Sequence, residues 1–319
     1  LAYMSNKDNR IVFMGTPDFA MHILKGLIQN KFNIVAVITA PDRPAGRGRK
    51  IKQSPVKTYS KNEKLKLFQP KNLKDPVFIK DLKNLNIDLQ IVVAFRMLPK
   101  IVWEIPSMGT INLHASLLPQ YRGSAPINWA IINGETETGV TTFFIDEKID
   151  TGDIIMQSKT KISIDDTAGT LHDKLMSSGL KLVIKTILKI NESNQRTVQN
   201  ENDKLKTAPK LNKDNCKIDW GKNPKQIIDF IRGLNPVPGA WTVIKNGDNQ
   251  INIKIFKVKF EKQDQSSAVG TIFSNKSSIK ISVSGGFIHL IEFKFPGKKQ
   301  MDVKSFLNGF NFERNSKMI

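Results

Sequence analysis

The feature that most constrains the fold is an alternation of short Ile- and Val-rich runs with amphipathic helical windows. Three runs, Ile11–Met14, Ile34–Thr39 and Ile91–Phe95, are largely apolar and have the length of strands. Amphipathic windows over Phe19–Gln29 and Val56–Lys64 follow the first two. Strands that are apolar on both sides are typical of a parallel sheet covered by helices on both faces. The sequence therefore predicts an α/β domain that binds its ligands at the carboxyl ends of the strands.

The second part of the chain has a different pattern. A long amphipathic window over Thr167–Ile190 closes the first domain, and a polar, aperiodic stretch follows it. Pro224–Leu234 has helical periodicity, whereas later runs such as Gln250–Phe260 and Phe287–Phe295 alternate with period two, which predicts an antiparallel sheet or a small barrel. The expected segments are a disordered start at 1–9, with Met4 as the native start, an α/β domain at 10–192, a linker at 193–213 and a β-barrel domain at 214–319.

Several classes of protein are excluded. No apolar run approaches the roughly 18 residues of a membrane span, and the start of the chain has no apolar signal-peptide core. The single cysteine, Cys216, allows neither an internal disulfide nor a cysteine metal cluster, as expected in a reducing compartment. No GxGxxG motif follows the first predicted strand, which disfavours a dinucleotide-binding enzyme. We therefore expect a cytoplasmic protein without a membrane span, and a monomer because long heptad patterns are absent.

The charge gives the first indication of a partner. Lysine and arginine number 49 against 29 acidic residues, a net charge of +20. Such an excess favours binding to a polyanion such as a nucleic acid. The alternative is a lysine-rich codon bias, with which the abundance of Asn, Ile and Lys agrees.

The strongest local motif runs from Gly109 to Pro119. Residues two apart in a strand share a face, so Asn112 and His114 point to one side and Ile111 to the other. An amide and an imidazole then converge at the end of a strand, where α/β enzymes keep their sites. The alternative is a half-buried strand whose polar face meets only water or makes a hydrogen bond in the core.

Two loops have unusual charge. Asp146–Asp153 is an acidic loop between an apolar run and a strand, and Pro41–Lys50 combines basic residues with Gly and Pro. The first offers candidate carboxylates for chemistry, and the second suits phosphates. Solvated loops are the alternative in both cases.

Taken together, these stretches resemble the folate-dependent formyltransferases, and the resemblance extends over essentially the whole chain from Arg10. The matching stretches are Thr16–Ala20, Pro41–Gly48, Ser54–Lys57, Asn112–Pro119 with Arg122–Gly123, Ala125–Pro126, Asp150–Asp153, Ile218–Trp220 and Asn235–Pro236.

The resemblance implies a Rossmann-like parallel-sheet formyltransferase domain followed by a small OB-like β-barrel domain. It implies transfer of the formyl group of 10-formyltetrahydrofolate to the α-amine of initiator methionyl-tRNA, without a metal. The implied catalytic residues are Asn112, His114 and Asp150. The residues expected around the folate are Ser116, Leu117, Leu118, Pro119, Arg96, Met97, Leu98 and Val102. The residues expected to contact tRNA are Arg43, Arg47, Arg49, Lys50, Lys254, Lys257 and Lys259.

Other activities share the same core. Members of the family that act on glycinamide ribonucleotide or on sugar nucleotides are alternatives, but a small substrate gives no reason for the high positive charge. A noncatalytic RNA-binding protein on the same fold is disfavoured by the intact catalytic residues. One departure from the family is the Phe95–Pro99 stretch, where many members carry a longer turn containing Tyr-Gly.

Overall fold

The structure is a computed structural model, and it describes residues 8–45, 50–190, 196–200 and 204–319. The chain forms two compact units. The first contains the residues up to 123, 137–161 and 172–207, and the second contains 124–136, 162–171 and 208–319. Two short segments of the chain, 124–136 and 162–171, therefore belong to the second unit before the long segment from residue 208 onward. The domain boundaries expected at residues 192 and 213 stay a prediction.

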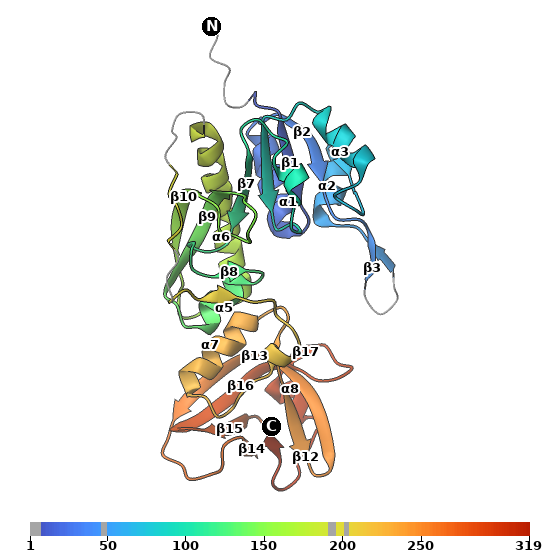
Figure 1. Ribbon diagram of the computed structural model, residues 1–319. Helices are drawn as coiled ribbons and strands as arrows, with labels where there is room; N and C mark the ends of the chain where they lie inside the picture. Colours follow the sequence, from blue (N-terminus) through green and yellow to red (C-terminus); the bar gives the residue numbers. More distant parts are fainter. Residues whose placement is uncertain (1–7, 46–49, 191–195, 201–203) are drawn as a thin grey trace. The chain divides into compact units, whose positions relative to one another are not determined.

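The first unit is built on a seven-stranded sheet in the order β10-β9-β7-β6-β1-β2-β5 (Figure 1). Its strands are β1 (Ile11–Gly15), β2 (Ile34–Ile38), β5 (Leu67–Phe68), β6 (Leu89–Val93), β7 (Thr110–His114), β9 (Glu137–Phe144) and β10 (Ile154–Lys161). The five strands from β7 to β5 are parallel, and β9 and β10 are antiparallel to their neighbours. The predicted α/β class with a parallel sheet is confirmed, and two antiparallel strands extend it at one edge.

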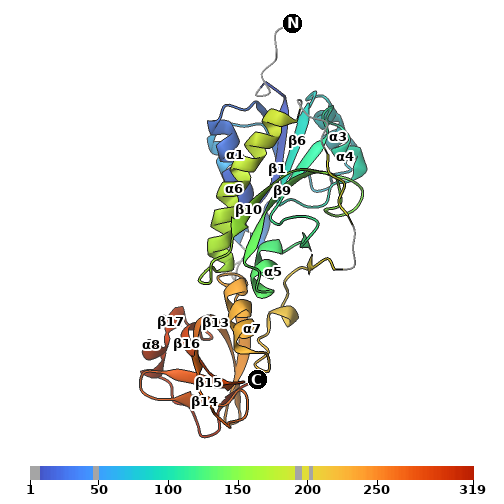
Figure 2. The same cartoon turned by 90° about the vertical axis from the view of Figure 1, so that its left-hand side faces the viewer.

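Helices cover both faces of this sheet. They are α1 (Asp18–Gln29), α2 (Pro55–Asn62), α3 (Pro76–Lys83), the short α4 (Lys100–Trp103) and α6 (Ala168–Lys189). Figure 2 shows α1 and α6 on one face and α3 and α4 on the other. Val12, Val92 and Val102 are buried in one apolar cluster under α3 and α4. Two helices begin where the sequence provides a cap, because the side chains of Ser54 and Asp75 accept backbone N–H groups at the starts of α2 and α3.

Short strands complete the first unit. β3 (Arg43–Ala45) and β4 (Lys50–Lys52) form a hairpin after β2, and β8 (Arg122–Gly123) follows β7. The two-residue strand β11 (Thr207–Ala208) pairs with β8.

The second unit is a nearly closed antiparallel barrel. Its elements are α5 (Pro126–Ile132), the 3-10 turn η1 (Asp214–Cys216), α7 (Pro224–Leu234), β12 (Ala240–Asn246), β13 (Asn249–Lys262), β14 (Ile272–Ser274), β15 (Ile279–Val283), β16 (Gly286–Lys294), β17 (Gln300–Asp302), α8 (Val303–Leu307) and β18 (Lys317–Met318). The sheet order is β14-β15-β16-β13-β12-β18, and a bridge between Thr271 and Lys317 joins its two ends. The predicted small barrel is therefore confirmed. Its core contains alternate residues of the strands together with Ile227 and Ile231 of α7.

No helix in the described ranges is long and apolar enough to cross a membrane.

Candidate active site

Asn112 and His114 lie at the carboxyl end of β7. Asn112 is in register with Val92 of β6, and residues in register on neighbouring strands share a face. Asn112 and His114 therefore lie on the sheet face that α3 and α4 cover. Leu113 points to the other face, where a Cβ added at Gly179 of α6 would be 2.9 Å from its Cδ2. The alternation predicted for this strand is confirmed.

Oxygen atoms face both ring nitrogens of His114, which is buried. Nε2 lies 2.9 Å from the carbonyl oxygen of Tyr121, and Nδ1 lies 3.7 Å from Oδ2 of Asp150. A carbonyl can only accept a hydrogen bond, so Nε2 carries a proton in this arrangement. Nδ1 is then the ring nitrogen that can exchange a proton with the carboxylate. The Asn112 amide is half-buried and has no hydrogen bond to another residue of the described ranges, so its N–H groups can serve a ligand.

Asp150 lies in a tightly defined turn between β9 and β10. Its backbone has a φ of 57°, in the left-handed region that Asp tolerates better than most residues. Its Oδ2 accepts a hydrogen bond of 3.0 Å from the Gly123 N–H. At Gly152 a Cβ would come within 1.8 Å of the Phe144 carbonyl oxygen, so the turn requires glycine there. The Asp150 side chain is only 12% exposed, which differs from the solvated acidic loop that was the alternative.

The loop that follows β7 is held by its own hydrogen bonds. Ser116 is fully buried, and its hydroxyl donates to the Gln120 carbonyl over 2.6 Å. Leu118 is buried as well, while Leu117 and Pro119 are partly exposed. Of the four residues expected near the folate in this loop, Leu117 and Pro119 are thus the more accessible.

The four remaining residues expected near the folate follow β6. Leu98 and Val102 are buried in the cluster that contains Val92, and Met97 is 68% exposed. The guanidinium of Arg96 donates to the carbonyl groups of residues 70 and 71 in the loop before α3. Burial, followed by the nearby charge of Arg43, lowers the pKa of Arg96 below its ordinary value. Arg96 therefore ties two loops together beside the strand ends.

Two of the basic residues expected at the first tRNA contact, Arg43 and Lys50, lie on the β3–β4 hairpin. Arg43 begins β3 and is exposed, and Lys50 begins β4. Arg47 and Arg49 lie outside the described residues.

An ion pair holds the root of this hairpin. Nζ of Lys57, on α2, lies 2.6 Å from Oδ2 of Asp42, and the Gln69 amide donates to the other carboxylate oxygen over 3.1 Å. These hydrogen bonds, from Lys57 first and then Gln69, hold the pKa of Asp42 below its ordinary value.

The three lysines expected on the barrel share its outer face because β13 is irregular. A bulge just before Lys257 adds a residue, so Lys254, Lys257 and Lys259 are all exposed despite their uneven spacing. Their surroundings differ. Lys257 lies opposite Glu292, and Lys259 lies opposite His289 on β16.

Lys254 belongs to a basic cluster around one indole ring, which we call the Trp241 patch: Lys213, Lys217, Trp241 and Lys254. Lys254 is opposite Trp241 on β12. The ammonium groups of Lys213 and Lys217 lie 5.4 and 5.7 Å from the ring centroid, within cation–π range. Within the described residues, none of the three lysines forms an ion pair with a carboxylate.

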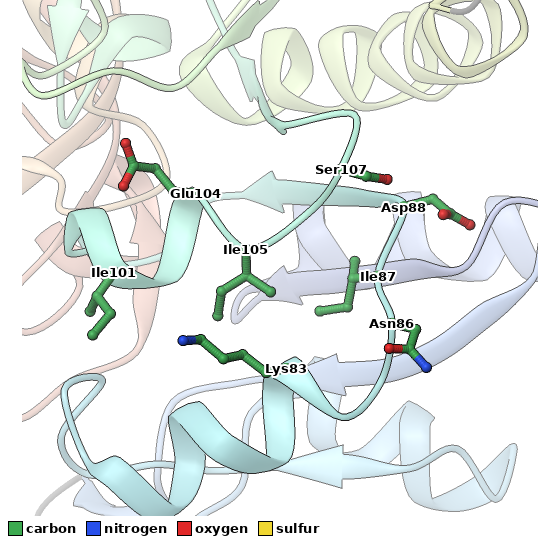
Figure 3. Close-up of a pocket in the computed structure, with 8 residues that line it drawn as sticks. All are labelled: Lys83, Asn86, Ile87, Asp88, Ile101, Glu104, Ile105 and Ser107. Atoms are coloured by element: carbon green, nitrogen blue, oxygen red, sulfur yellow. The ribbon is translucent and has the colours of Figure 1, made fainter.

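Two cavities lie away from these residues. One, of about 620 Å³, is lined by residues that precede β6, such as Asn86 and Ile87, and by residues of α4 and the loop after it (Figure 3). It therefore lies toward the amino end of β6, whereas Asn112 and His114 lie toward the carboxyl end of β7. The other, of about 580 Å³, is in the second unit, where apolar side chains such as Ile162 and Phe260 and charged ones such as Asp229 line it. In the described ranges, no three His, Cys, Asp or Glu side chains are grouped to hold a metal ion.

Three residues of the site are absent from the sequence prediction. Tyr121 and Gly123 contribute only backbone groups, for which side-chain chemistry gives no signal. Gln199 donates to two carbonyl groups of the Asp150 turn, although the polar stretch around it is typical of a linker.

Comparisons with known proteins agree with this geometry. A family described as formyl transferase matches residues 9–187, and the formyl transferase C-terminal domain matches residues 210–311. The chain belongs to the formyltransferase family.

Relatives of this formyltransferase share nearly its whole length. The methionyl-tRNA formyltransferase of Flavobacterium johnsoniae is 54% identical over 97% of this chain and 98% of its own, and that of Bacteroides fragilis is 47% identical over 99% of each chain. Among solved structures, the N-formyltransferase of Helicobacter canadensis in complex with folinic acid and dTDP-3-aminofucose has a TM-score of 0.64. It is 25% identical, over 88% of this chain and 98% of its own.

Proposed function

We propose that the protein transfers the formyl group of 10-formyltetrahydrofolate to the α-amino group of initiator methionyl-tRNA. The observation that carries this proposal is the convergence of Asn112, His114 and Asp150 at the carboxyl end of β7, in a chain 54% identical to a methionyl-tRNA formyltransferase along nearly its whole length.

The reaction needs an oxyanion site and a path for protons. The neutral amine attacks the formyl carbon, the carbonyl becomes an oxyanion, and the bond to the folate nitrogen N10 then breaks. The amine loses one proton, and N10 gains one. The Asn112 amide, which has no partner in the described chain, can donate a hydrogen bond to the oxyanion, and the Nε2–H of His114 can donate a second one when it turns from the Tyr121 carbonyl to the substrate. Asp150 faces Nδ1 of His114 at 3.7 Å and can orient the ring and accept the proton released by the amine.

Apolar residues after β6 suit the flat ring system of the co-substrate. Leu98 and Val102 are buried on the same sheet face as Asn112, and Met97, next to Leu98 in the chain, is exposed. Leu117 and Pro119 are the accessible side of the loop after β7 and would border the formyl group. The folinic acid bound by the Helicobacter canadensis relative supports a folate at this family's site.

Two basic regions suit the tRNA. Arg43, Arg47, Arg49 and Lys50 would contact the acceptor end. On the barrel, Lys254, Lys257 and Lys259 would contact phosphates. The Trp241 patch adds lysines without carboxylate partners in the described chain and an aromatic ring, the combination that phosphates and unpaired bases favour.

A sugar-nucleotide substrate is the second candidate, because the Helicobacter canadensis relative was solved with an amino sugar nucleotide. Its identity to this chain is 25%, against 54% for the methionyl-tRNA enzyme, and a small substrate leaves the charge of +20 without a role.

The test supplies the purified protein with 10-formyltetrahydrofolate and, in parallel reactions, with methionyl-tRNA, an amino sugar nucleotide or glycinamide ribonucleotide. Formylation is followed by mass spectrometry of the product. We expect rapid formylation of methionyl-tRNA alone. Turnover only with a small substrate would overturn the proposal.

A further inference from the structure

We infer that Gln199 is a positioning residue that fixes the carboxylate of Asp150 against the His114 imidazole. The catalytic role of Gln199 rests on the proposed function, whereas the hydrogen bonds that position Asp150 do not. Gln199 is 7% exposed and lies after α6, far along the chain from β7.

The hydrogen-bonding capacity of the Gln199 amide is fully used within the site. Its Nε2 donates to the carbonyl of Asp150 over 3.0 Å and to that of Gly152 over 2.7 Å. Its Oε1 accepts from Nη2 and Nε of Arg122 over 2.8 and 3.2 Å. A carboxamide has two N–H groups and two acceptor positions, and each has a partner here.

These hydrogen bonds close a ring around the catalytic carboxylate. Arg122 immediately precedes Gly123, whose N–H donates to Oδ2 of Asp150. Gln199 thus joins the strand that supplies this N–H to the turn that supplies the carboxylate. Asp150 has a left-handed backbone, which costs energy and persists only where the surroundings hold it. The two carbonyl contacts of Gln199 provide such a hold.

The segment that carries Gln199 is itself anchored. Thr197 exchanges two backbone hydrogen bonds of 2.9 Å with Ile154 at the start of β10. The guanidinium of Arg196 lies 4.1 Å from the ring centroid of Phe144, at the end of β9. Both strands flank the Asp150 turn, so the position of Gln199 is set by the sheet rather than by the chain around it.

The position of the carboxylate matters because proton transfer and oxyanion stabilisation fall off steeply with misplacement. Removal of Gln199 leaves Asp150 in the chain but frees its turn. Turnover should fall, while binding of the formyl donor should hardly change because Gln199 contacts neither strand end expected to hold it.

The experiment combines Gln199→Met, which keeps the length but makes no hydrogen bonds, with Asp150→Asn in a double-mutant cycle. Single-turnover formylation of methionyl-tRNA should fall about 10- to 100-fold for Gln199→Met in the native background, and by less than about twofold in the Asp150→Asn background. The KM for 10-formyltetrahydrofolate should stay within about twofold. Val198→Ala is the matched control, since Val198 is the neighbouring residue and 70% exposed.

An equal loss in both backgrounds would assign Gln199 to general stability, and an unchanged rate would remove it from the site. A second measurement needs no substrate: the ring signals of His114 in NMR spectra should shift in Gln199→Met and not in Val198→Ala. If the wild type does not formylate methionyl-tRNA, the proposed function fails. The positioning role is then decided by the NMR arm alone, and unchanged His114 signals would overturn it.

Discussion

Polar side chains dominate both the site around His114 and the outer face of the barrel. The two regions differ in how far these side chains are buried and in whether they are paired. Around His114 the polar groups other than the Asn112 amide are buried and paired within the chain, as for His114 with Tyr121 and Asp150 with Gly123. In the Trp241 patch the lysines are exposed, and none pairs with a carboxylate of the described chain.

The difference matches two different functions, stabilisation of a transition state and binding of a phosphate backbone. A developing oxyanion is stabilised by groups that need no reorganisation during the reaction, so the donors must be fixed and kept from water. A phosphate backbone is bound through the release of counterions, so exposed and uncompensated positive charge is effective without a fixed geometry. Substitutions in the first region should therefore change the rate, and those in the second should change affinity and its dependence on salt.

The largest expected effect tests the first half of this comparison. His114→Ala and Asn112→Ala should each lower single-turnover formylation about 100- to 1,000-fold, because each removes a donor to the oxyanion. Asp150→Asn should be at least as damaging, since the amide keeps the shape but cannot accept the proton. The affinity for tRNA, measured by equilibrium binding, should hardly change.

His172→Ala is a suitable control. This imidazole lies on α6 against the ring of Phe19, and α6 covers the sheet face opposite to that of Asn112 and His114 (Figure 2). A loss of less than about tenfold for both His114→Ala and Asn112→Ala would contradict their role at the oxyanion.

The second effect is smaller and concerns tRNA affinity. Alanine at Lys213, Lys217 and Lys254 should weaken binding and make its salt dependence shallower, by about 0.9 in log–log slope for each duplex phosphate that the variant no longer neutralises. Alanine at Lys257 and Lys259 should change the slope less, because the carboxylate of Glu292 lies opposite Lys257 and that of Glu261 is close enough to interact with Lys259.

The test measures tRNA binding over a series of salt concentrations for the wild type and both alanine variants, and compares the slopes. Equal changes in slope would extend the contact surface over Lys254, Lys257 and Lys259, as the sequence predicts. Unchanged slopes in both would leave tRNA recognition to the β3–β4 hairpin and assign the barrel lysines to solubility.

The parts that sequence could predict are those that local periodicity determines. The alternation in β7 predicts which face Asn112 and His114 share, because a strand repeats every two residues whatever surrounds it. Pro224–Leu234 is a helix with the predicted bounds, since a proline at its first turn and an amphipathic pattern mark it locally.

The parts that escaped prediction depend on contacts between distant segments. Nothing near Gln199 in the sequence indicates that the amide meets the Asp150 turn, and only the family resemblance brought Asp150 to His114. The bulge in β13 likewise comes from its pairing with β16, so the shared face of Lys254 and Lys257 contradicts a simple period of two. Backbone partners such as the Tyr121 carbonyl carry no sequence signal at all.

The smallest expected effect concerns the Asp42–Lys57 pair. Its exposure lies between that of the buried groups around His114 and that of the lysines on the barrel. Its side chains are 23% and 10% exposed, against 71% and 58% for the surface pair of Glu147 and Lys100. Hydrogen bonds from Lys57 and Gln69 lower the pKa of Asp42 in the folded state. Because the pKa of Asp42 is lower in the folded state, ionised Asp42 stabilises the fold at any pH above its pKa in the unfolded state, which is about 4. This contribution is lost as the pH falls through the pKa of the folded state.

Asp42→Asn should therefore lower the melting temperature at pH 7, and its difference from the wild type should narrow as the pH falls below about 4. Glu147→Gln is the control, because its pair is exposed and largely screened, and it should have the smaller effect at every pH and almost none at high salt. A melting series over pH and salt measures both. If the melting-temperature change of Asp42→Asn depends on salt as strongly as that of Glu147→Gln, the Asp42–Lys57 pair is screened like the exposed lysines of the barrel. Partial burial of an ion pair would then not by itself give the fixed geometry found around His114.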